Sequence, residues 1–473
     1  MRDGDHQGHG SPPTPDGGIW SPSRRPLTVG LILTVTLVAL EALAVATVMP
    51  EVRADLGGYD LYGWVFSGFF LASIVGIVVG GPAADRRGLV VPFTAGLVLF
   101  AAGLAVAGLA PSMEVLVLGR ILQGLGAGAV PAASYAAIAR GFEASERPHM
   151  FALLSTAWVV PGLVGPAAAA AVEHALSWRW VFLGLLPVVA VAGALTVGPL
   201  ARVPSPIGSG ADLPDAGGSR SGFGRSARMT GLVGGVGAVF VALTGVPGPL
   251  ALVLVGIGLP LAVWAFAGMV PDGTLRLAPG VPATVAVRGL LTWSFFQADA
   301  YVSLAVVDGR GSSTFVAGAA LSAGSVLWAA GSWMQARQID RLGPRTLVGA
   351  GFTVIISALA LTAGVALGLP VPVLVAAWGI GGFGMGLAYS PLSVVVLGSA
   401  RPGEEGASSA ALQLSDVLGI AVGTGVGGGV VALADTRGWE VSSGVAVVFT
   451  MATVVGLVGL AASRRIPASL NPR

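Results

Sequence analysis

Apolar runs of about twenty residues follow one another along most of the chain, and no other feature constrains the fold as strongly. A run of that length spans the hydrocarbon core of a bilayer, about 30 Å thick, as one α-helix. Only 10% of the 473 residues are charged, whereas soluble domains carry about 25%. Because lipid offers the backbone no hydrogen-bond partners, helices are the favoured spanning elements. The chain is therefore predicted to be an all-α polytopic membrane protein.

The apolar runs predict fourteen spans. They lie near residues 27–49, 61–81, 90–110, 114–138, 149–172, 179–200, 230–246, 249–270, 284–307, 313–336, 346–367, 371–399, 407–433 and 441–462. The seventh and eighth are short, and the sequence VPGP joins them as a tight turn. An even number of crossings places both termini on the same side of the membrane.

The distribution of Arg predicts which side that is. If both termini are cytoplasmic, 19 of the 25 Arg fall in the inner segments and 4 in the outer segments. Such an excess of basic residues in cytoplasmic loops is the usual determinant of orientation. We expect a multi-pass protein of a bacterial plasma membrane with both termini in the cytoplasm.

Several function classes are excluded by what the sequence lacks. The chain has no Cys, so disulfides and thiolate metal sites are ruled out. No phosphate-binding G-x-x-x-x-G-K-[ST] motif and no His/Glu metal constellation is present. The net charge of +2 reflects topological Arg rather than nucleic-acid binding. We expect a transporter rather than an enzyme, with no metal and no cofactor.

An internal repeat divides the chain. The motif D-R-x-G occurs as Asp85-Arg86-Arg87-Gly88 after the second span and again, 255 residues later, as Asp340-Arg341-Leu342-Gly343 after the tenth. Carboxylates within spans precede the two motifs at similar distances, Glu41 by 44 residues and Asp299 by 41. Internal repeats are common in secondary transporters, which bind substrate near the membrane midplane where the repeats meet.

The repeat and the polar segments predict the domain organisation. We expect a disordered tail at 1–26, a six-helix bundle at 27–200, a flexible cytoplasmic linker at 201–229, an inserted two-helix hairpin at 230–270, a second six-helix bundle at 284–462 and a cytoplasmic tail at 463–473.

The motifs resemble those of the major facilitator superfamily, and among its members the fourteen-span drug:proton antiporters. GPAADRRG follows the second span, GRILQGLGAGA lies in the fourth and PGLVGPAAAA in the fifth. The resemblance implies two six-helix bundles with two inserted central helices, a monomer in the bilayer, and efflux of lipophilic or cationic compounds driven by a proton gradient. The fifth-span motif ends in Ala where the family has Gly, which leaves open a proton-coupled transporter of one metabolite.

The resemblance also assigns roles to motif residues. The residues implied in a cytoplasmic gate are Gly81, Asp85, Arg86, Gly88, Asp340, Arg341 and Gly343. The residues implied in the antiporter motif of the fifth span are Gly162, Gly165 and Pro166.

Three charged residues lie within spans at a similar predicted depth. Glu41 is 8 residues from the outer end of its span, Arg120 is 6 residues and Asp299 is 8 residues, which is about 9–12 Å at 1.5 Å per residue. Burial favours a neutral carboxyl group, whereas a neighbouring Arg favours the charged form. A carboxyl group between these influences can bind and release a proton, so we expect a proton-coupling site. The alternative is a permanent ion pair that fixes helix packing.

Other residues within spans are candidates for the substrate cavity: Gln123, Trp158, Trp293, Phe295, Phe296, Tyr389 and Asp416. Helix packing is the alternative role for the aromatic residues, and a hydrogen bond to a neighbouring helix is the alternative for Asp416. Arg288 lies only 4 residues into its span, so its side chain is expected to extend to the inner surface.

Overall fold

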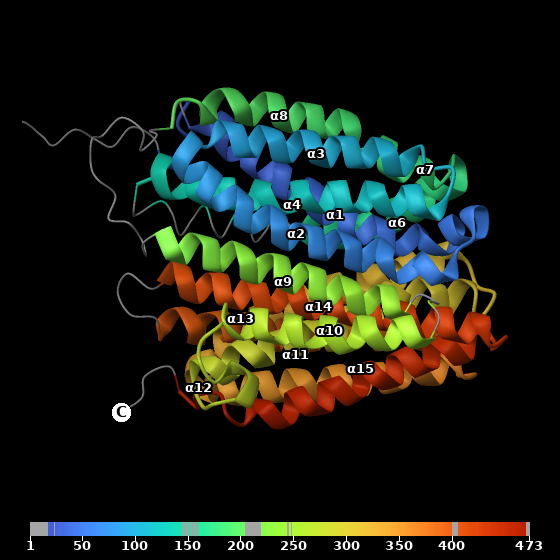
Figure 1. Ribbon diagram of the computed structural model, residues 1–473. Coiled ribbons are helices and arrows are strands. Elements are labelled where there is room, and N and C mark those ends of the chain that lie inside the picture. Colours follow the sequence, from blue (N-terminus) through green and yellow to red (C-terminus); the bar gives the residue numbers. More distant parts are fainter. Residues whose placement is uncertain are drawn as a thin grey trace, which may run out of the picture.

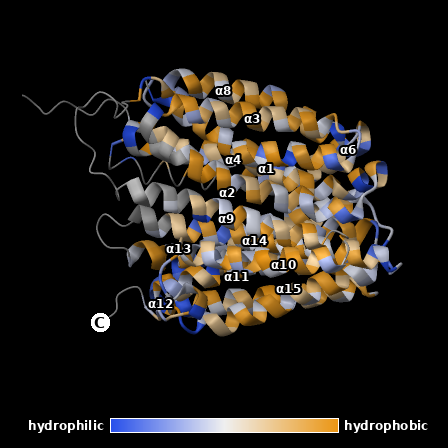
Figure 2. Ribbon diagram, viewed as in Figure 1, coloured by the Kyte–Doolittle hydropathy of each residue, from blue (hydrophilic) through white to orange (hydrophobic). Residues whose placement is uncertain are grey.

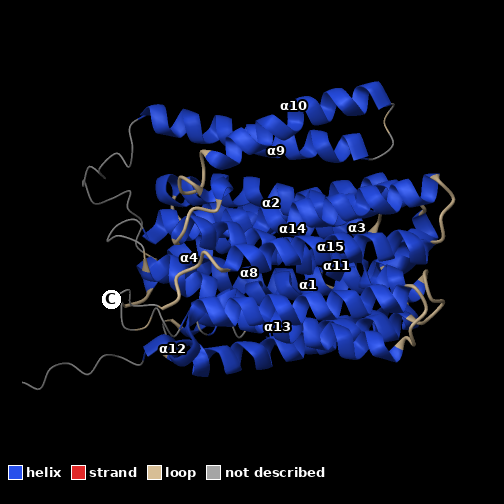
Figure 3. Ribbon diagram, turned by 90° about the horizontal axis from the view of Figure 1, so that it is seen from below, coloured by secondary structure: helices blue, strands red, loops and turns tan. Residues whose placement is uncertain are grey.

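The helical class is confirmed. A computed structural model describes residues 18–22, 24–143, 146, 150, 153, 157, 159–203, 219–243, 246, 248–399 and 405–469. These residues form helices and connecting loops with no strand among them (Figures 1 and 3). Eleven of the described helices are long and apolar enough to cross a membrane. The total of fourteen crossings and the side of the termini stay predictions.

The N-terminal helices form one bundle, drawn in blue to green in Figure 1. They are α1 (Arg25–Leu56), α2 (Tyr59–Arg87), α3 (Val90–Gly108), α4 (Met113–Gly141), α6 (Val159–Ala175), α7 (Arg179–Leu183) and α8 (Leu186–Leu200). In this bundle α4 packs against α2 and α3, while α1 packs against α6 and α8. The predicted sixth span, 179–200, is thus divided between α7 and α8.

The C-terminal helices form the second bundle, drawn in yellow to red in Figure 1. They are α11 (Val281–Val307), α12 (Thr314–Ala366), α13 (Pro372–Gly398), α14 (Glu405–Thr436) and α15 (Val441–Ser463). At 53 residues, α12 is far longer than one crossing needs. It contains two of the predicted spans and is interrupted at Gly343, whose backbone is not helical.

The two D-R-x-G motifs share one backbone conformation. Gly88, directly after α2, has φ 76° and ψ 172°, and Gly343 inside α12 has φ 73° and ψ 159°. A positive φ of this size strongly favours glycine. The repeat seen in the sequence therefore corresponds to the same sharp turn between consecutive helices in both bundles.

The inserted hairpin consists of α9 (Ser219–Leu243) and α10 (Gly248–Ala267). It lies at one edge of the molecule in Figure 3. α9 packs against α2 of the first bundle and α14 of the second, and the Phe240 ring meets the Trp64 ring edge-on at 5.7 Å between centroids. α10 exposes large apolar side chains such as Leu252, which is 76% exposed, as a lipid-facing helix does.

Hydropathy along the helices fits a membrane protein. Figure 2 shows hydrophilic residues gathered at the two ends of the bundles and mostly hydrophobic residues between them. Large apolar side chains are also exposed on the flanks, among them Val98 at 62% and Val454 at 54%. Lipid rather than water is the solvent that suits such a surface.

The bundles are bonded to each other at their predicted outer ends. Arg53 of α1 forms an ion pair of 2.8 Å with Asp308, at the end of α11. Tyr59 donates a hydrogen bond of 3.2 Å to the same carboxylate, and the Arg53 guanidinium lies 4.4 Å from the Tyr59 ring centroid. We call Arg53, Tyr59 and Asp308 the outer latch.

Close backbone contact continues below the outer latch. A Cβ added to Gly63 of α2 would lie 2.5 Å from the Cα of Gly428 in α14. The rings of Tyr62 and Tyr301 lie beside this contact, 5.4 Å apart. The structure is therefore closed between the bundles at this end.

Candidate functional site

Glu41 of α1 and Arg120 of α4 form an ion pair inside the N-terminal bundle. Only 1% of the Glu41 side chain and 2% of the Arg120 side chain are exposed. Arg120 Nη1 donates to Glu41 Oε1 and, at 3.1 Å, to Gln123 Oε1. Gln123 Nε2 donates to Glu41 Oε1 at 3.1 Å. The structure therefore brings three of the predicted site residues into one buried polar cluster.

Arg120 is oriented by α2 as well as by Glu41. Its Nε donates a hydrogen bond of 2.9 Å to Val65 O, and its guanidinium lies 4.3 Å from the centroid of the Phe69 ring. A planar guanidinium held by such contacts has little freedom to turn. Arg120 and Gln123 are three residues apart on α4, which puts them on one face of the helix.

The glycines after Gln123 explain how α2 comes so close. A Cβ at Gly124 would lie 2.1 Å from Phe69 O, and a Cβ at Gly128 would lie 2.1 Å from Ser73 O. Both oxygens belong to α2, so a larger residue at either position would push α2 away from α4. The glycines of the motif thus allow the α2 backbone to reach Arg120.

One oxygen of Glu41 has no hydrogen-bond partner in the part of the chain that the structure describes. Oε1 accepts both hydrogen bonds of the cluster, whereas Oε2 is buried and bonded to none of the described residues. Leaving a buried polar atom without a hydrogen bond is unfavourable, and a proton on Oε2 would remove the negative charge. The Arg120 guanidinium acts in the opposite direction, because it stabilises the carboxylate. A group that gains and loses a proton needs such opposed influences.

Asp299 lies apart from this cluster, on α11. Its Oδ1 accepts a hydrogen bond of 3.1 Å from Trp378 Nε1, and its side chain is half-buried. No cation among the described residues is paired with it. The structure does not bring Asp299 into contact with Glu41 or Arg120, so its shared role with them stays a prediction.

Arg288 corrects an expectation. Its side chain does not extend to the inner surface, since only 4% of the residue is exposed. Its Nε donates at 2.8 Å to Asp416 Oδ1 on α14, and its Nη1 donates at 2.7 Å to Tyr389 O on α13. Tyr389 completes the group by donating at 2.9 Å to Asp416 Oδ2. Arg288 thus remains buried because Asp416, on another helix, balances its charge in place of solvent.

The predicted aromatic residues of the cavity are only partly together. Phe295 and Phe296 touch edge-on at 5.4 Å between centroids. Trp293 instead points to its own helix, where its Nε1 donates at 2.8 Å to Gln297 Oε1. Trp158 lies outside the described residues.

The cytoplasmic gate is described in part. The backbone of α2 includes Gly81, Asp85 and Arg86, but the side chains of Asp85 and Arg86 lie outside what the structure describes. Asp340 and Arg341, the matching pair on α12, are both exposed. The gate function of these residues stays a prediction.

The antiporter-motif helix, α6, lies where the bundles meet. A Cβ at Gly162 would lie 2.6 Å from the Cβ of Ser325 in α12. A Cβ at Gly318 of α12 would lie 2.9 Å from Pro166 O. A Cβ at Gly165 would lie 3.0 Å from the side chain of Leu40 in α1. These small residues thus allow close packing of α6 against both bundles.

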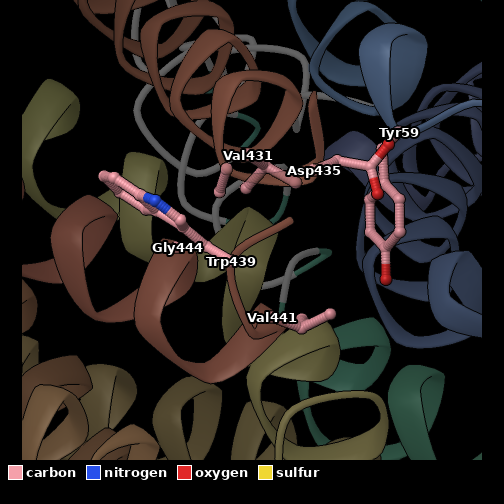
Figure 4. A pocket seen from close by; sticks show the side chains of 7 residues that line it. Tyr59, Val431, Asp435, Trp439, Val441 and Gly444 are labelled. Atoms are coloured by element: carbon pink, nitrogen blue, oxygen red, sulfur yellow. The ribbon is translucent and has the colours of Figure 1, made fainter. Parts of the chain in front are cut away.

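A small pocket opens at the predicted outer end, away from the charged clusters (Figure 4). Its lining comes from α2, α14, α15 and the loop between α14 and α15: Tyr59, Val431, Ala434, Asp435, Trp439, Val441 and Gly444. Tyr59 is also a member of the outer latch, so this pocket belongs to the closed seam between the bundles.

Comparison with known proteins decides the family. Residues 31–367 match the model of the Major Facilitator Superfamily. The chain belongs to this superfamily. The family expected from the motifs is therefore confirmed, and the chain is a transporter with several membrane-spanning helices.

A relative of this superfamily member is named as a probable multidrug-efflux transporter, and solved structures share its fold. The probable multidrug-efflux transporter Rv1634 of Mycobacterium tuberculosis (strain ATCC 25618 / H37Rv) is 29% identical over 450 residues, covering 90% of this chain and 91% of the relative. An auto-inhibited POT family peptide transporter has a TM-score of 0.66 at 16% identity, covering 94% of this chain and 99% of the other. A D-xylose-proton symporter has a TM-score of 0.63 at 15% identity, covering 94% and 98%. The two structures show the fold alone.

Sequence reasoning missed two residues of this facilitator's C-terminal bundle. Trp378 is the hydrogen-bond donor to Asp299, and Trp328 packs against Phe295 and Phe296. Their sequence signal is an aromatic residue in the middle of a span. That signal alone does not separate a cavity residue from a packing residue.

Proposed function

We propose that this transporter exports small lipophilic or cationic compounds in exchange for protons, by alternating access. Export is supported by relatives that are named multidrug-efflux transporters. Proton coupling is supported by one observation above all, which is the buried cluster of Glu41, Arg120 and Gln123 with its unbonded Oε2. Ionisable residues inside membrane proteins commonly mark proton and ion pathways.

The cluster suggests how a proton changes the conformational equilibrium. Protonation of Oε2 neutralises Glu41 and weakens its attraction to Arg120, because Oε1 then accepts the Arg120 hydrogen bond as a neutral carbonyl oxygen. Release of the proton restores the pair between α1 and α4. If the cluster differs between the inward-facing and outward-facing states, the proton favours one of them by its difference in binding free energy.

The proposal includes the setting of the protein. It places a monomer in the bacterial plasma membrane, with the proton gradient as the energy source and no cofactor. Proton-coupled transport of a single metabolite is the competing function in the same fold.

Transport in proteoliposomes with an imposed pH gradient tests this proposal across a panel of cationic dyes and drugs. We expect the wild-type protein to accumulate several of them, and Glu41→Gln to remove the gradient-driven part. Glu114→Gln is the matched control, because Glu114 is an exposed residue on the same helix as Arg120. Gradient-driven transport that survives Glu41→Gln contradicts proton coupling through Glu41. Failure to transport any lipophilic compound favours the metabolite transporter.

A further inference from the structure

A continuous row of aromatic rings runs through the C-terminal bundle from Asp299. Trp378, the hydrogen-bond donor to Asp299, stacks on Phe295 with 5.1 Å between centroids and 22° between planes. Phe295 meets Trp328 edge-on at 5.8 Å, and Trp328 meets Tyr389 at 5.4 Å. We call Trp378, Phe295, Trp328 and Tyr389 the aromatic row.

The aromatic row ends at a second charged group. The Arg288 guanidinium lies 3.0 Å from the centroid of the Tyr389 ring. Arg288, Phe295 and Asp299 are seven and four residues apart on α11, so they lie on one face of the helix. Arg288 and Asp299 are thus separated by about 16 Å along the helix axis.

The two ends of the row differ in charge balance. Arg288 is neutralised by Asp416, at 2.8 Å. Asp299 has a Trp donor but no cation among the described residues. The row therefore carries one carboxylate without a counterion, at its Asp299 end. Inside a membrane such a group requires a proton or a cationic partner.

Part of this arrangement is less buried than the rest. Phe295 and Trp378 are buried, at 4% and 1% exposure, and form the inner layer. Asp299, Trp328 and Tyr389 are only half-buried. The less buried edge thus combines ring faces and a carboxylate, the combination that binds organic cations.

Glu41 offers no comparable place for a cation. It is enclosed, its Oε1 is already bonded to Arg120 and Gln123, and the Arg120 guanidinium would repel a second positive charge. The two intramembrane carboxylates therefore differ in what they can accept.

From this contrast we propose that Asp299 is the anchor for the charged group of aromatic cations, while the aromatic row holds their rings and Glu41 is reserved for the proton. This inference deepens the proposed export function and rests on it for its transport consequence. It makes Asp299 a specificity-determining residue: cationic aromatic compounds need it, and uncharged compounds of similar shape do not.

Equilibrium binding to the purified full-length protein tests the assignment without any gradient. The probes are tetraphenylphosphonium, a permanent cation, and triphenylphosphine oxide, an uncharged compound that also carries phenyl rings. We expect Asp299→Asn to raise the Kd of the cation about tenfold or more and to leave that of the uncharged compound within about twofold. Asp299→Glu should recover part of the affinity for the cation.

Two further variants separate the roles. Trp328→Ala should weaken both probes by about three- to tenfold, because it removes a ring without changing charge. Glu41→Gln should change the Kd of both probes by the same factor, because it shifts the conformational equilibrium and leaves the cation's own partner in place. Asp272→Asn is the matched control, because Asp272 is exposed and lies outside the predicted spans.

Several outcomes overturn the assignment. They are an unchanged Kd of the cation in Asp299→Asn, an equal loss for both probes in that variant, no binding of the cation by the wild-type protein, or a loss in Glu41→Gln that is confined to the cation. Binding is measured without a gradient. The Kd values therefore still test the role of Asp299 if the protein turns out not to export compounds in exchange for protons. Conversely, Asp299→Asn can be tested for proton-driven transport of uncharged compounds. If that transport survives, the export proposal stands, and the Kd of the cation alone decides whether Asp299 is its anchor.

Discussion

Among the described residues, the Glu41 carboxylate is hydrogen-bonded through one oxygen only, and that oxygen is bonded to Arg120. Removing one partner of a buried ion pair leaves an uncompensated charge. The free energy of unfolding of a variant without Arg120 therefore reports whether Glu41 is still charged there.

Arg120→Met should lower the free energy of unfolding in detergent by about 3–5 kcal/mol, because it strands the Glu41 charge. The double variant Glu41→Gln/Arg120→Met should recover much of that loss, because the amide carries no charge. Thermal unfolding of the purified variants measures both effects.

Arg179→Met is the control for this cycle. Arg179 pairs with Asp55 at 2.7 Å, but the two side chains are 36% and 47% exposed. Such surface pairs contribute at most about 1 kcal/mol. A double variant no more stable than Arg120→Met alone contradicts the stranded charge as the cause.

At the scale of single residues, the sequence predicted part of the site. Depth along two helices placed Glu41 and Arg120 in one layer, and the structure pairs them. Gln123 was expected in the substrate cavity, whereas the structure shows it bonded to both of them. The same depth argument failed for Arg288, because a count along one helix contains no information about Asp416, 128 residues away. The unbonded Oε2 was also beyond prediction, since it depends on side-chain geometry.

Among the elements, the seam between α2 and α14 depends on two glycines. Gly63 and Gly428 allow the backbones to touch, and a Cβ on either would lie within 2.5 Å of the other's Cα. Additional atoms in such a packed contact cost about 1–3 kcal/mol. An added side-chain atom at either glycine would therefore destabilise the closed outer end by that amount.

Gly63→Ala should therefore open the outer seam. The reporter is Ser67→Cys, a buried position one turn deeper on α2, and it gives the chain its only thiol because the sequence has no Cys. In vesicles, a membrane-impermeant maleimide should label it at least about fivefold faster with Gly63→Ala than without.

Gly68→Ala is the matched control on the same helix. A Cβ there would lie 3.5 Å from the nearest atom, Ile121 Cγ1, which is an ordinary contact. Its labelling rate should equal that of the reporter alone. Equal rates in all three proteins would show that the glycine contact does not hold the seam.

Element limits followed from the sequence where apolar runs end at Gly, Pro or charge. The turn at Gly343 was marked by its D-R-x-G motif, and the structure shows why the glycine is needed. By contrast, the partners of each helix did not follow from the sequence, because apolar runs of Ala, Val and Leu are alike on many faces. The packing of α6 on α12 is one such pairing.

For the molecule as a whole, the outer latch links conformation to pH. Burial raises the pKa of the Asp308 carboxyl above its ordinary value of 3.8, although the Arg53 guanidinium opposes that rise. A closed latch with a raised pKa binds a proton more tightly than an open latch with an ordinary pKa. Acidification at this side therefore favours the closed latch, and the effect is lost as the pH rises through the raised pKa.

The Ser67→Cys reporter measures this linkage. As the outer pH falls toward the ordinary pKa of Asp308, we expect labelling to slow by more than the thiol's own titration explains. Asp308→Asn supplies that reference, because it retains the thiol and removes the titrating carboxyl. Faster labelling on acidification, relative to Asp308→Asn, would reverse the sign.

The inserted hairpin adds a mechanical consequence. Since α9 touches both α2 and α14, any rocking that parts these helices must shear its contacts, including that between Phe240 and Trp64. Its partner α10 faces lipid over most of its surface. The lipid around the hairpin therefore acts, through α9, on the contact between α2 and α14. Bilayer thickness and viscosity thereby become part of the friction that each transport cycle works against.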